Sequence, residues 1–203
     1  MRIKVDGGIL AGGLSTRMGG ADKGLQPYKN KAMVSWVYEA LKPYVDNIHI
    51  NCNRNHPLYQ AISPNLCEDT ISGFQGPLAG LVSLMEASSA DYLLISPCDT
   101  PLLPAEYARR MLAELTILLD RKPSLPLLLA AKDAHRNHPL HLCISTQFKG
   151  AIEATLDLGE RRVMKWINAN QPHWVDFSDF PTHFSNFNSK EDLGRTGASF
   201  QTK

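Results

Sequence analysis

The chain has 203 residues, 43% of them hydrophobic, and its 21 basic and 20 acidic side chains give a net charge of +1. This length and composition suffice for one sizeable hydrophobic core, so we expect a single domain over residues 1–203. The balanced charge excludes a global electrostatic attraction to nucleic acid or to an anionic membrane, and any anionic ligand must be attracted locally.

The cysteines and the hydrophobic segments indicate where the protein works. Four cysteines, at positions 52, 67, 98 and 143, are widely separated and include no Cys-x-x-Cys pair, which argues against a zinc site or a thioredoxin-like motif. Such cysteines are typical of buried thiols in a reducing compartment. The first ten residues carry Lys4 and Asp6 and lack the apolar region of a signal peptide, and no segment has the ~20 apolar residues that span a bilayer. We expect a cytoplasmic protein without a membrane anchor.

Short apolar runs alternate with segments of helical period from the first residues onward. Residues 3–10 predict a strand, and apolar residues at 34, 37, 38 and 41 place one stripe on a helix that Pro43 ends. A second strand is expected over residues 47–52. The next helix starts near Gly76-Pro77, where a proline is tolerated because its missing N–H would be unpaired anyway.

The second half of the chain continues this alternation with less regularity. Residues 92–95 form a continuous apolar run, typical of a strand buried on both faces, and Asp99 projects from its carboxyl end. A long helix from Pro104, strands at 127–131 and 140–144, a polar loop at 132–138 and helices near 147–157 and 161–169 follow. The pattern predicts an α/β fold, a single Rossmann-like domain with a mostly parallel central sheet and helices on both faces.

A glycine-rich loop follows the first predicted strand. Residues 10–23 read Leu-Ala-Gly-Gly-Leu-Ser-Thr-Arg-Met-Gly-Gly-Ala-Asp-Lys. Glycines allow the backbone N–H groups to approach an anion, and Arg17 and Lys23 add positive charge. The loop is not a Walker A motif, because Lys23 is followed by Gly24, and its glycine spacing does not fit the dinucleotide fingerprint. The combination predicts a phosphate-binding loop rather than an ordinary glycine turn.

Asp99 is expected beside this loop, because ligands of open parallel sheets bind beyond the carboxyl ends of the strands. Mg²⁺ commonly takes one or two carboxylates together with waters and phosphate oxygens. An aspartate before Thr-Pro is also a common helix N-cap. The glycine loop favours Asp99 as a Mg²⁺ ligand over that alternative.

The loop and the segment Cys98-Asp99-Thr100-Pro101 resemble the signature of nucleotidyltransferases that move a nucleotide onto a phosphorylated acceptor. Later motifs resemble, more narrowly, the molybdenum cofactor guanylyltransferase (MobA) family. The similarity runs in order over residues 9–193. Its motifs are Gly-Pro-Leu-Ala-Gly at 76–80, Glu-Arg-Arg-Val at 160–163, Val-Asp-Phe-Ser-Asp at 175–179 and Asn-Phe-Asn at 186–188.

The resemblance implies a Mg²⁺-dependent enzyme that joins GTP to molybdopterin, or its molybdenum-bound form, and releases pyrophosphate. It implies a mainly GTP-binding half over residues 1–100 and a mainly acceptor-binding half over residues 101–203. Catalytic roles fall on Arg17, Lys23 and Asp99, with Asp99 also on the metal. The implied nucleotide contacts are Leu10, Ala11, Gly12, Gly13, Lys23, Asn51, Asp69 and Asp99.

The acceptor side carries fewer clear signals. Arg161, with its neighbour Arg162, is expected to grip the acceptor phosphate, although paired arginines are usually solvated. Asn186 and Asn188 have amides able to read polar edges, although such residues are often helix caps. Histidines 135, 138 and 141 are poorly spaced for one metal, and we interpret them as surface or acceptor contacts.

The sequence departs from the family pattern at two places and is compatible with several alternative functions. His138-Pro139-Leu140 stands where the family more usually has a His-Pro-Thr type sequence, and Asp6 is an unexpected charge in the first strand. Asp69 is as compatible with ribose contact or a simple turn as with guanine recognition. The alternatives are a sibling enzyme, such as a molybdopterin cytidylyltransferase or a sugar-phosphate nucleotidyltransferase, and a noncatalytic GTP-binding delivery protein. Partners in cofactor biosynthesis and in delivery to target enzymes are expected.

Overall fold

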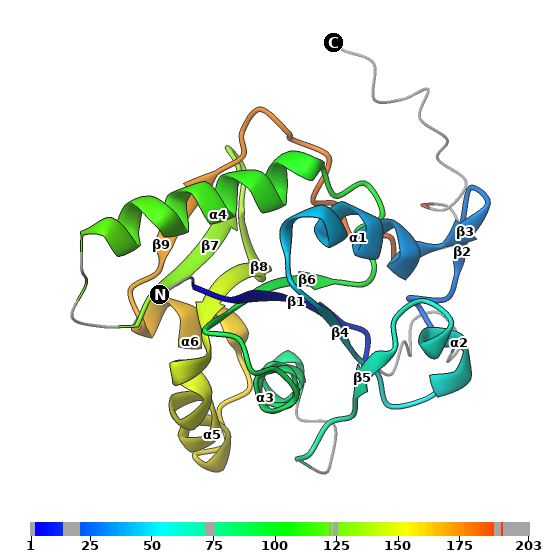
Figure 1. The fold of residues 1–203 in the computed structure, drawn as a ribbon, viewed down its shortest axis with the longest axis horizontal. Helices are drawn as coiled ribbons and strands as arrows, with labels where there is room; N and C mark the ends of the chain where they lie inside the picture. The colour runs from blue at the N-terminus through cyan, green and yellow to red at the C-terminus, as the bar shows by residue number, and fades with distance from the viewer. Residues whose placement is uncertain are drawn as a thin grey trace.

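The computed structural model describes residues 3–13, 21–71, 76–121, 123, 126–188 and 192. Its centre is a seven-stranded sheet in the order β5-β4-β1-β6-β8-β7-β9, and two short strands form a separate hairpin (Figure 1). The strands of the large sheet are β1 (Val5–Leu10), β4 (Ile48–Asn51), β5 (Asn65–Cys67), β6 (Tyr92–Pro97), β7 (Leu128–Lys132), β8 (Asn137–Ser145) and β9 (His173–Asp176). The hairpin consists of β2 (Pro27–Tyr28) and β3 (Lys31–Ala32).

The prediction of a mostly parallel sheet is confirmed. The pairs β1–β4, β1–β6, β4–β5 and β7–β9 are parallel, and β8 runs antiparallel to both of its neighbours. The reversal follows from the short turn between β7 and β8, since a tight hairpin joins antiparallel strands. In that turn Asp133 accepts hydrogen bonds from the main-chain N–H groups of His135 and Arg136, at 2.7 and 2.9 Å.

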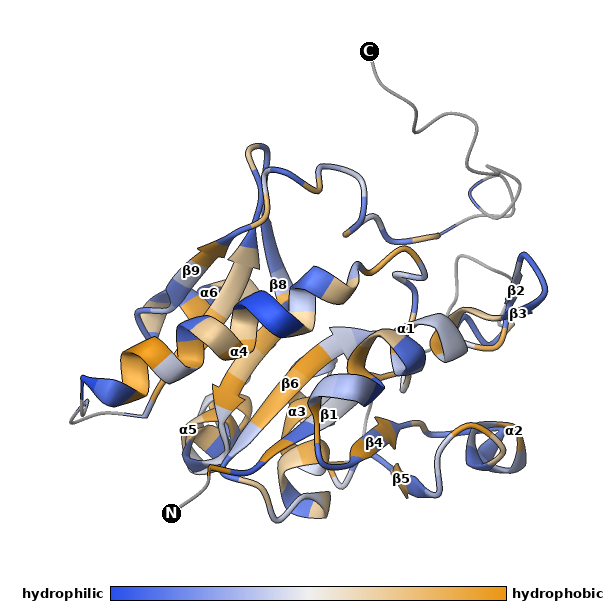
Figure 2. Cartoon of the chain, turned by 45° about the horizontal axis from the view of Figure 1, so that its top comes forward, coloured by the Kyte–Doolittle hydropathy of each residue, from blue (hydrophilic) through white to orange (hydrophobic). Residues whose placement is uncertain are grey.

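Helices cover both faces of the sheet, as predicted (Figure 2). α1 (Met33–Leu41) and α4 (Ala105–Asp120) contribute to one hydrophobic core, and α3 (Pro77–Ala87), α5 (Lys149–Asp157) and α6 (Val163–Ala169) contribute to the other. The short helix α2 (His56–Gln60) precedes β5, and single turns of 3₁₀ helix follow α1 and β8, at η2 (Lys42–Tyr44) and η3 (Thr146–Phe148). Among the described residues, no helix combines the length and apolarity that a membrane crossing requires.

The unexpected charge in the first strand is structurally satisfied. Asp6 is buried, and its carboxylate accepts hydrogen bonds from Asn47, from Ser88 Oγ at 2.6 Å and from His49 Nε2 at 3.2 Å. Burial alone would raise the pKa of Asp6, but the hydrogen bonds from Ser88, Asn47 and His49 lower it below its usual value. Asp6 therefore ties the end of α3 to β1 and β4, away from the carboxyl ends of these strands.

After β9 the chain crosses the end of α4 and returns towards the hairpin (Figure 1). We call residues 177–188 the C-terminal strap. Phe177 and Phe184 enter the core beside Tyr107, with ring centroids 6.0 and 5.9 Å from its ring. Phe187 packs against Tyr28 and Met33, where the ring centroids of Phe187 and Tyr28 are 5.0 Å apart. The strap thus joins the last strand to the segment that follows the glycine loop.

Candidate active site

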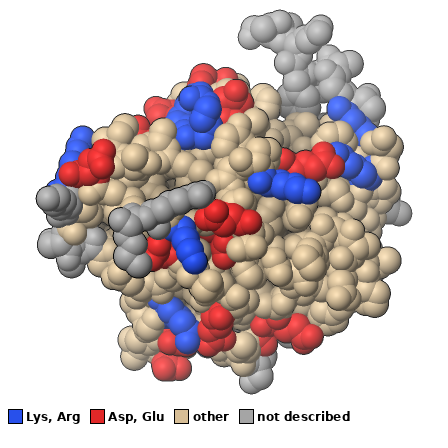
Figure 3. Space-filling model, viewed as in Figure 1, with Lys and Arg blue, Asp and Glu red and all other residues tan. Residues whose placement is uncertain are grey.

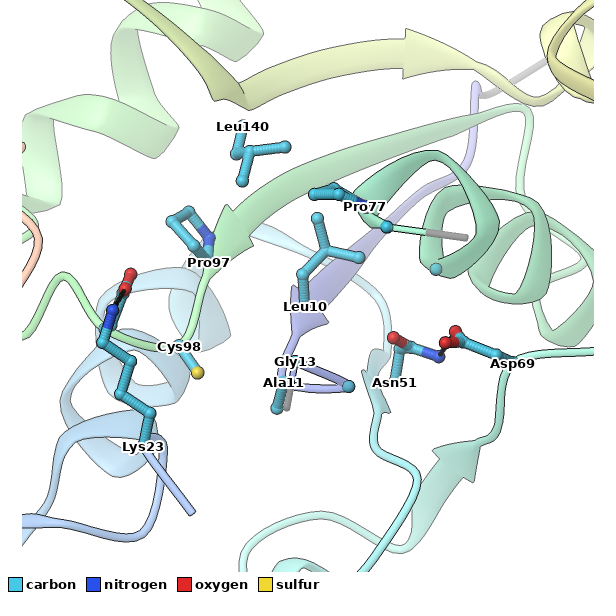
Figure 4. A pocket seen from close by; sticks show the side chains of 14 residues that line it. Leu10, Ala11, Gly13, Lys23, Asn51, Asp69, Pro77, Pro97, Cys98 and Leu140 are labelled. Carbon is cyan, nitrogen blue, oxygen red and sulfur yellow. Dashed lines mark hydrogen bonds and ion pairs between the residues drawn. The ribbon is translucent and has the colours of Figure 1, made fainter. Parts of the chain in front are cut away.

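A pocket of about 350 Å³ opens at the carboxyl ends of β1, β4 and β6. Figure 4 shows Lys23 on one side of Leu10 and Ala11 and the Asn51–Asp69 pair on the other. The pocket lies where ligands of open α/β sheets bind. Its lining residues are Leu10, Ala11, Gly12, Gly13, Lys23, Asn51, Asp69, Gly76, Pro77, Gly80, Pro97, Cys98, Asp99 and Leu140.

The end of β1 is fixed by amides from β4 and the loop after it. Asn53 Nδ2 donates to the main-chain oxygen of Gly12 at 3.1 Å. A Cβ on Gly12 would lie 2.8 Å from both Asn51 Oδ1 and Asn53 Nδ2, too close for any other residue without movement. The absence of a side chain at Gly12 therefore keeps the loop and these amides in contact.

A carboxylate and two amides form the wall opposite Lys23. Asp69 accepts hydrogen bonds from Asn51 Nδ2 at 2.9 Å and from Asn53 Nδ2 at 2.8 Å, and its own N–H donates to Asn53 Oδ1 at 2.8 Å. These contacts fix the side chain of Asp69 at the pocket rather than leaving it in a solvated turn. Asn53 was not identified from the sequence, although it lies only two residues after Asn51, in the loop that follows β4.

Helix α3 begins at the pocket. Gly76, its N-cap, has a positive φ of 78°, and Pro77 occupies the first turn. Gly80 faces the pocket so closely that a Cβ there would lie 2.7 Å from Asn51 Oδ1 and 2.7 Å from Leu10 Cδ2. The helix therefore approaches the strand ends closely, with its N-terminus and partial positive charge beside the pocket.

Lys23 and Asp99 meet on the other side. The ammonium of Lys23 forms an ion pair with Asp99 Oδ2 and also donates a hydrogen bond to Asn188 Oδ1. Asp99 follows β6 and is 6% exposed. Because α4 has Pro104 as its N-cap, Asp99 is not the cap of that helix. The structure thus brings together Lys23, Asp99 and Asn188, which are far apart in the sequence.

The remaining oxygen of Asp99 tests whether the site fits a metal. Among the described residues, Asp99 Oδ1 is buried and accepts no hydrogen bond. A buried carboxylate oxygen without a donor suits a cation. The described part of the chain holds no group of three or more His, Cys, Asp or Glu side chains arranged for a metal. The donor set therefore fits Mg²⁺ held by one carboxylate and completed by waters and phosphate oxygens.

Asp22, which sequence reasoning missed, anchors the end of the glycine loop. It is 8% exposed, and it accepts hydrogen bonds from Tyr59 Oη at 2.6 Å and Asn55 Nδ2 at 2.9 Å. These contacts fix the residue directly before Lys23. Only its position beside Lys23 could have suggested this role. Arg17, expected to act with Lys23, lies outside the described residues.

Two of the three expected acceptor residues are held by local contacts. Arg161 is not among the pocket-lining residues, and its Nη1 donates to the main-chain oxygens of Leu156 at 2.6 Å and Glu160 at 3.2 Å. Asn186 is exposed, and its main-chain oxygen accepts from Asn188 Nδ2 at 3.4 Å. Asn188 differs from these two, because its Oδ1 accepts a hydrogen bond from the pocket-lining Lys23.

The surface interpretation of the histidines is wrong for two of the three. His138 and His141 are 5% and 2% exposed and pack against Phe184, with centroid distances of 4.7 and 4.9 Å. His138 Nε2 lies 2.8 Å from Asp133 Oδ2. Burial lowers the pKa of both histidines below the ordinary value, and more strongly for His141. They belong to an aromatic core under the strap, which the polar local sequence concealed.

One face of the molecule carries charges of both signs, and its described side chains form no basic patch. On the face seen in Figure 3, basic and acidic side chains are interspersed. Several are neighbours in ion pairs, such as Arg110 with Asp179 at 2.7 Å and Lys149 with Glu86 at 2.9 Å. At the pocket itself, Lys23 and the start of α3 supply positive charge that can attract a phosphate.

Comparisons with known proteins identify the family of the chain. The family model described as "MobA-like NTP transferase domain" matches residues 7–173. The molybdenum cofactor guanylyltransferase of Shewanella piezotolerans is 39% identical over 191 residues, which are 94% of this chain and 91% of that protein. The same-named protein of Shewanella pealeana is 39% identical over 197 residues, 97% of this chain and 96% of that protein.

Solved structures share the fold at lower identity. Molybdopterin-guanine dinucleotide biosynthesis protein A from Archaeoglobus fulgidus superposes with a TM-score of 0.69 at 18% identity, covering 94% of this chain and 95% of that chain. The 4-diphosphocytidyl-2C-methyl-D-erythritol synthase from Anaerococcus prevotii gives a TM-score of 0.70 at 10% identity, covering 98% and 99%. At these identities the likeness concerns the fold alone, which enzymes with different names share.

Proposed function

The chain belongs to the MobA-like NTP transferase family, and on this premise we propose that it transfers GMP from GTP to molybdopterin or Mo-molybdopterin, with release of pyrophosphate. The product is the guanine dinucleotide form of the cofactor. One observation carries the proposal: a single pocket has Lys23 and Asp99 on one side and the Asn51–Asp69 pair on the other. The first group suits a triphosphate, and the second suits the nucleoside.

In the proposed reaction, an oxygen of the acceptor's terminal phosphate attacks the α-phosphorus of GTP. A new P–O bond forms while the bond from the α-phosphorus to the bridging oxygen breaks, and pyrophosphate leaves with that electron pair. The attacking oxygen is already anionic, so the step needs no general base. The residues of the site must align two anions and neutralise their charge.

Lys23 is suited to the triphosphate because its compact ammonium is fixed by two oxygen acceptors, Asp99 and Asn188. The N–H groups of the glycine loop and the start of α3 would hold phosphate oxygens. Arg17 would add a second cation from the loop. Asp99 Oδ1 would hold Mg²⁺, and the bound ion would neutralise phosphate charge during the transfer.

Asp69 is proposed as the nucleoside contact. Its side chain, fixed by Asn51 and Asn53, can accept hydrogen bonds from guanine N–H groups or from ribose hydroxyls. Leu10, Ala11, Gly12 and Gly13 would approach the nucleotide through the main chain. Leu140 comes from the expected acceptor half and lines the pocket, while acceptor binding through Arg161, Asn186 and Asn188 stays a prediction.

A cytoplasmic location and hand-over of the product to delivery or target proteins are part of the proposal. All four cysteines are unpaired thiols, and burial raises the pKa of Cys52 and Cys143 to about 12. Thiols without disulfides are typical of proteins in a reducing compartment.

The test is pyrophosphate release from the purified full chain with molybdopterin and Mg²⁺, comparing GTP, ATP and CTP at equal concentrations. We expect release with GTP and little with the other two. Release with CTP instead would support a cytidylyltransferase. Tight GTP binding without pyrophosphate release in the presence of molybdopterin would support a delivery protein and overturn the proposal.

A further inference from the structure

The C-terminal strap reaches into the nucleotide side of the pocket. Phe187 is 4% exposed, and its main-chain N–H donates to the main-chain oxygen of Asp99 at 2.9 Å. Its ring packs against Tyr28 and Met33, in the segment that follows Lys23. Phe187 is thereby attached to both segments that supply the Lys23–Asp99 ion pair.

The next residue completes the contact. Asn188 Oδ1 accepts a hydrogen bond from the Lys23 ammonium, while Asn188 Nδ2 donates to the main-chain oxygen of Asn186 at 3.4 Å. The Asn188 main-chain N–H donates to Asp192 Oδ2 at 2.9 Å. Because an ammonium only donates, the amide oxygen must face Lys23, and the amide NH₂ group faces back into the strap. Both ends of the amide are therefore assigned by their partners.

We propose that Asn188 is a positioning residue for Lys23, which it holds at the triphosphate side of the pocket. The proposal rests on the proposed function and gives Asn188 a different role from the one expected from the sequence: it aligns the cation that meets GTP instead of reading the acceptor. With Asp99 as its one strong partner, the long side chain of Lys23 could still place its ammonium in several orientations. The second acceptor fixes the ammonium from another direction and leaves its third N–H for a phosphate oxygen.

An amide suits this place better than a carboxylate. A neutral oxygen orients the ammonium without cancelling its charge, which must remain available to a triphosphate. An aspartate at 188 would put a second negative charge beside Lys23, at the place where phosphate must enter. The structure therefore accounts for an asparagine at this position without assigning it any contact with the acceptor.

The test uses Asn188→Ala and Asn188→Asp in the full chain, with Ser185→Ala as the control from the same strap. Asn188 is exposed, so its replacement should leave the melting temperature within about one degree. We expect Asn188→Ala to lower kcat/KM for GTP about tenfold, as for loss of a hydrogen bond to a charged group. Asn188→Asp should lower it further by repelling the triphosphate, and the KM for molybdopterin should stay within about twofold.

A double-mutant cycle separates this role from others. If Asn188 acts through Lys23, adding Asn188→Ala to Lys23→Ala should change kcat/KM less than twofold. GTP affinity, measured calorimetrically with Mg²⁺ and no acceptor, supplies a second readout and should fall in Asn188→Ala but not in the control. An equal loss in both backgrounds, or a defect confined to the KM for molybdopterin, would overturn the proposal.

The calorimetric arm also keeps the two proposals apart. If the wild-type chain releases no pyrophosphate with molybdopterin, the proposed transferase function fails. The effect of Asn188 on GTP affinity is then still measured, and an unchanged affinity in Asn188→Ala would reject the positioning role by itself.

Discussion

The two sides of the pocket are held in place by different kinds of structure. On the nucleotide side, Gly12, Asn51 and Asp99 lie at or just after the ends of β1, β4 and β6. On the expected acceptor side, Arg161 lies between two helices and Asn186 lies on the strap. The first group is positioned by buried parallel strands, whereas the second is positioned by local contacts and by a long return of the chain.

This difference decides what each side can tolerate. Adjacent strand ends in a buried sheet have little freedom to move, so a small change in volume there should disturb the ligand directly. Residues on a strap or a helix connection are held by fewer contacts and should affect binding of one substrate at a time. Mutations on the two sides should therefore differ in size and in the kinetic constant they change.

The largest loss of activity is expected on the nucleotide side, at Lys23. Lys23→Ala removes the cation paired with Asp99 and should lower kcat about 10²- to 10³-fold, since a preorganised donor at developing charge contributes on that scale. Lys23→Arg, which keeps the charge but not the compact shape, should retain more activity. Pyrophosphate release under saturating GTP measures the effect. Unchanged turnover in Lys23→Ala would remove Lys23 from the mechanism.

A smaller effect is expected from a single methyl group on the nucleotide side. In Gly80→Ala the new Cβ would meet Asn51 Oδ1 and Leu10 Cδ2 at 2.7 Å. Displacement of Asn51 should raise the KM for GTP about tenfold to a hundredfold. Gly150→Ala in α5 is the matched control, because nothing lies within 4 Å of its added Cβ. Equal GTP kinetics in both variants would show that Asn51 and Leu10 can move to accommodate the added methyl group without loss of GTP binding.

On the acceptor side we expect a mutation to change the KM of one substrate only, by about tenfold. Arg161 is fixed by the main-chain oxygen of Leu156 at 2.6 Å, and a fixed guanidinium suits a phosphate. Arg161→Ala should therefore raise the KM for molybdopterin about tenfold and leave that for GTP unchanged. Lys165→Ala removes a nearby cation that pairs with Glu160 at 2.7 Å and serves as the control. A raised KM for GTP in Arg161→Ala would show that Arg161 acts on the nucleotide side of the pocket and not on the acceptor side.

The same contrast explains what the sequence could predict. The strands β1, β4 and β6 and the helices α1 and α3 were predicted to within a few residues, because each carries an apolar run or a helical period in its own sequence. The edge strands β5 and β9, the hairpin β2–β3 and the short helix α2 were not, since they are too short to show a period. The placement of the glycine loop and of Asp99 at strand ends followed from topology, whereas Asn51 and Asp69 were implied by the family resemblance. The contact of Asn188 with Lys23, 165 residues away, has no local signal.

The smallest effect should be a pH dependence of folding stability that arises from the buried histidines under the C-terminal strap. His141 is buried beside Phe184 and Tyr107, and burial holds its pKa well below the ordinary value of 6.5. The folded state therefore binds fewer protons than the unfolded state, and stability should fall as the pH drops below about 6.5, by up to about 1.4 kcal/mol per pH unit. Protonation of His138 in the unfolded chain adds to this trend, since its pKa is also lowered.

Urea unfolding at pH 7.5, 6.5 and 5.5 measures this dependence, and His141→Gln should reduce the slope at the cost of some stability at neutral pH, while the lowered pKa values of His138 and His183 keep part of it. The lowered pKa of Asp6 stabilises the fold at pH values above 3.8, and this stabilisation is lost only as the pH falls below 3.8. Asp6 therefore cannot produce a slope between pH 5.5 and 7.5. His135, which is exposed, gives the matched control in His135→Gln. If the slope survives in full in His141→Gln and disappears in His135→Gln, the buried aromatic core does not govern the acid sensitivity.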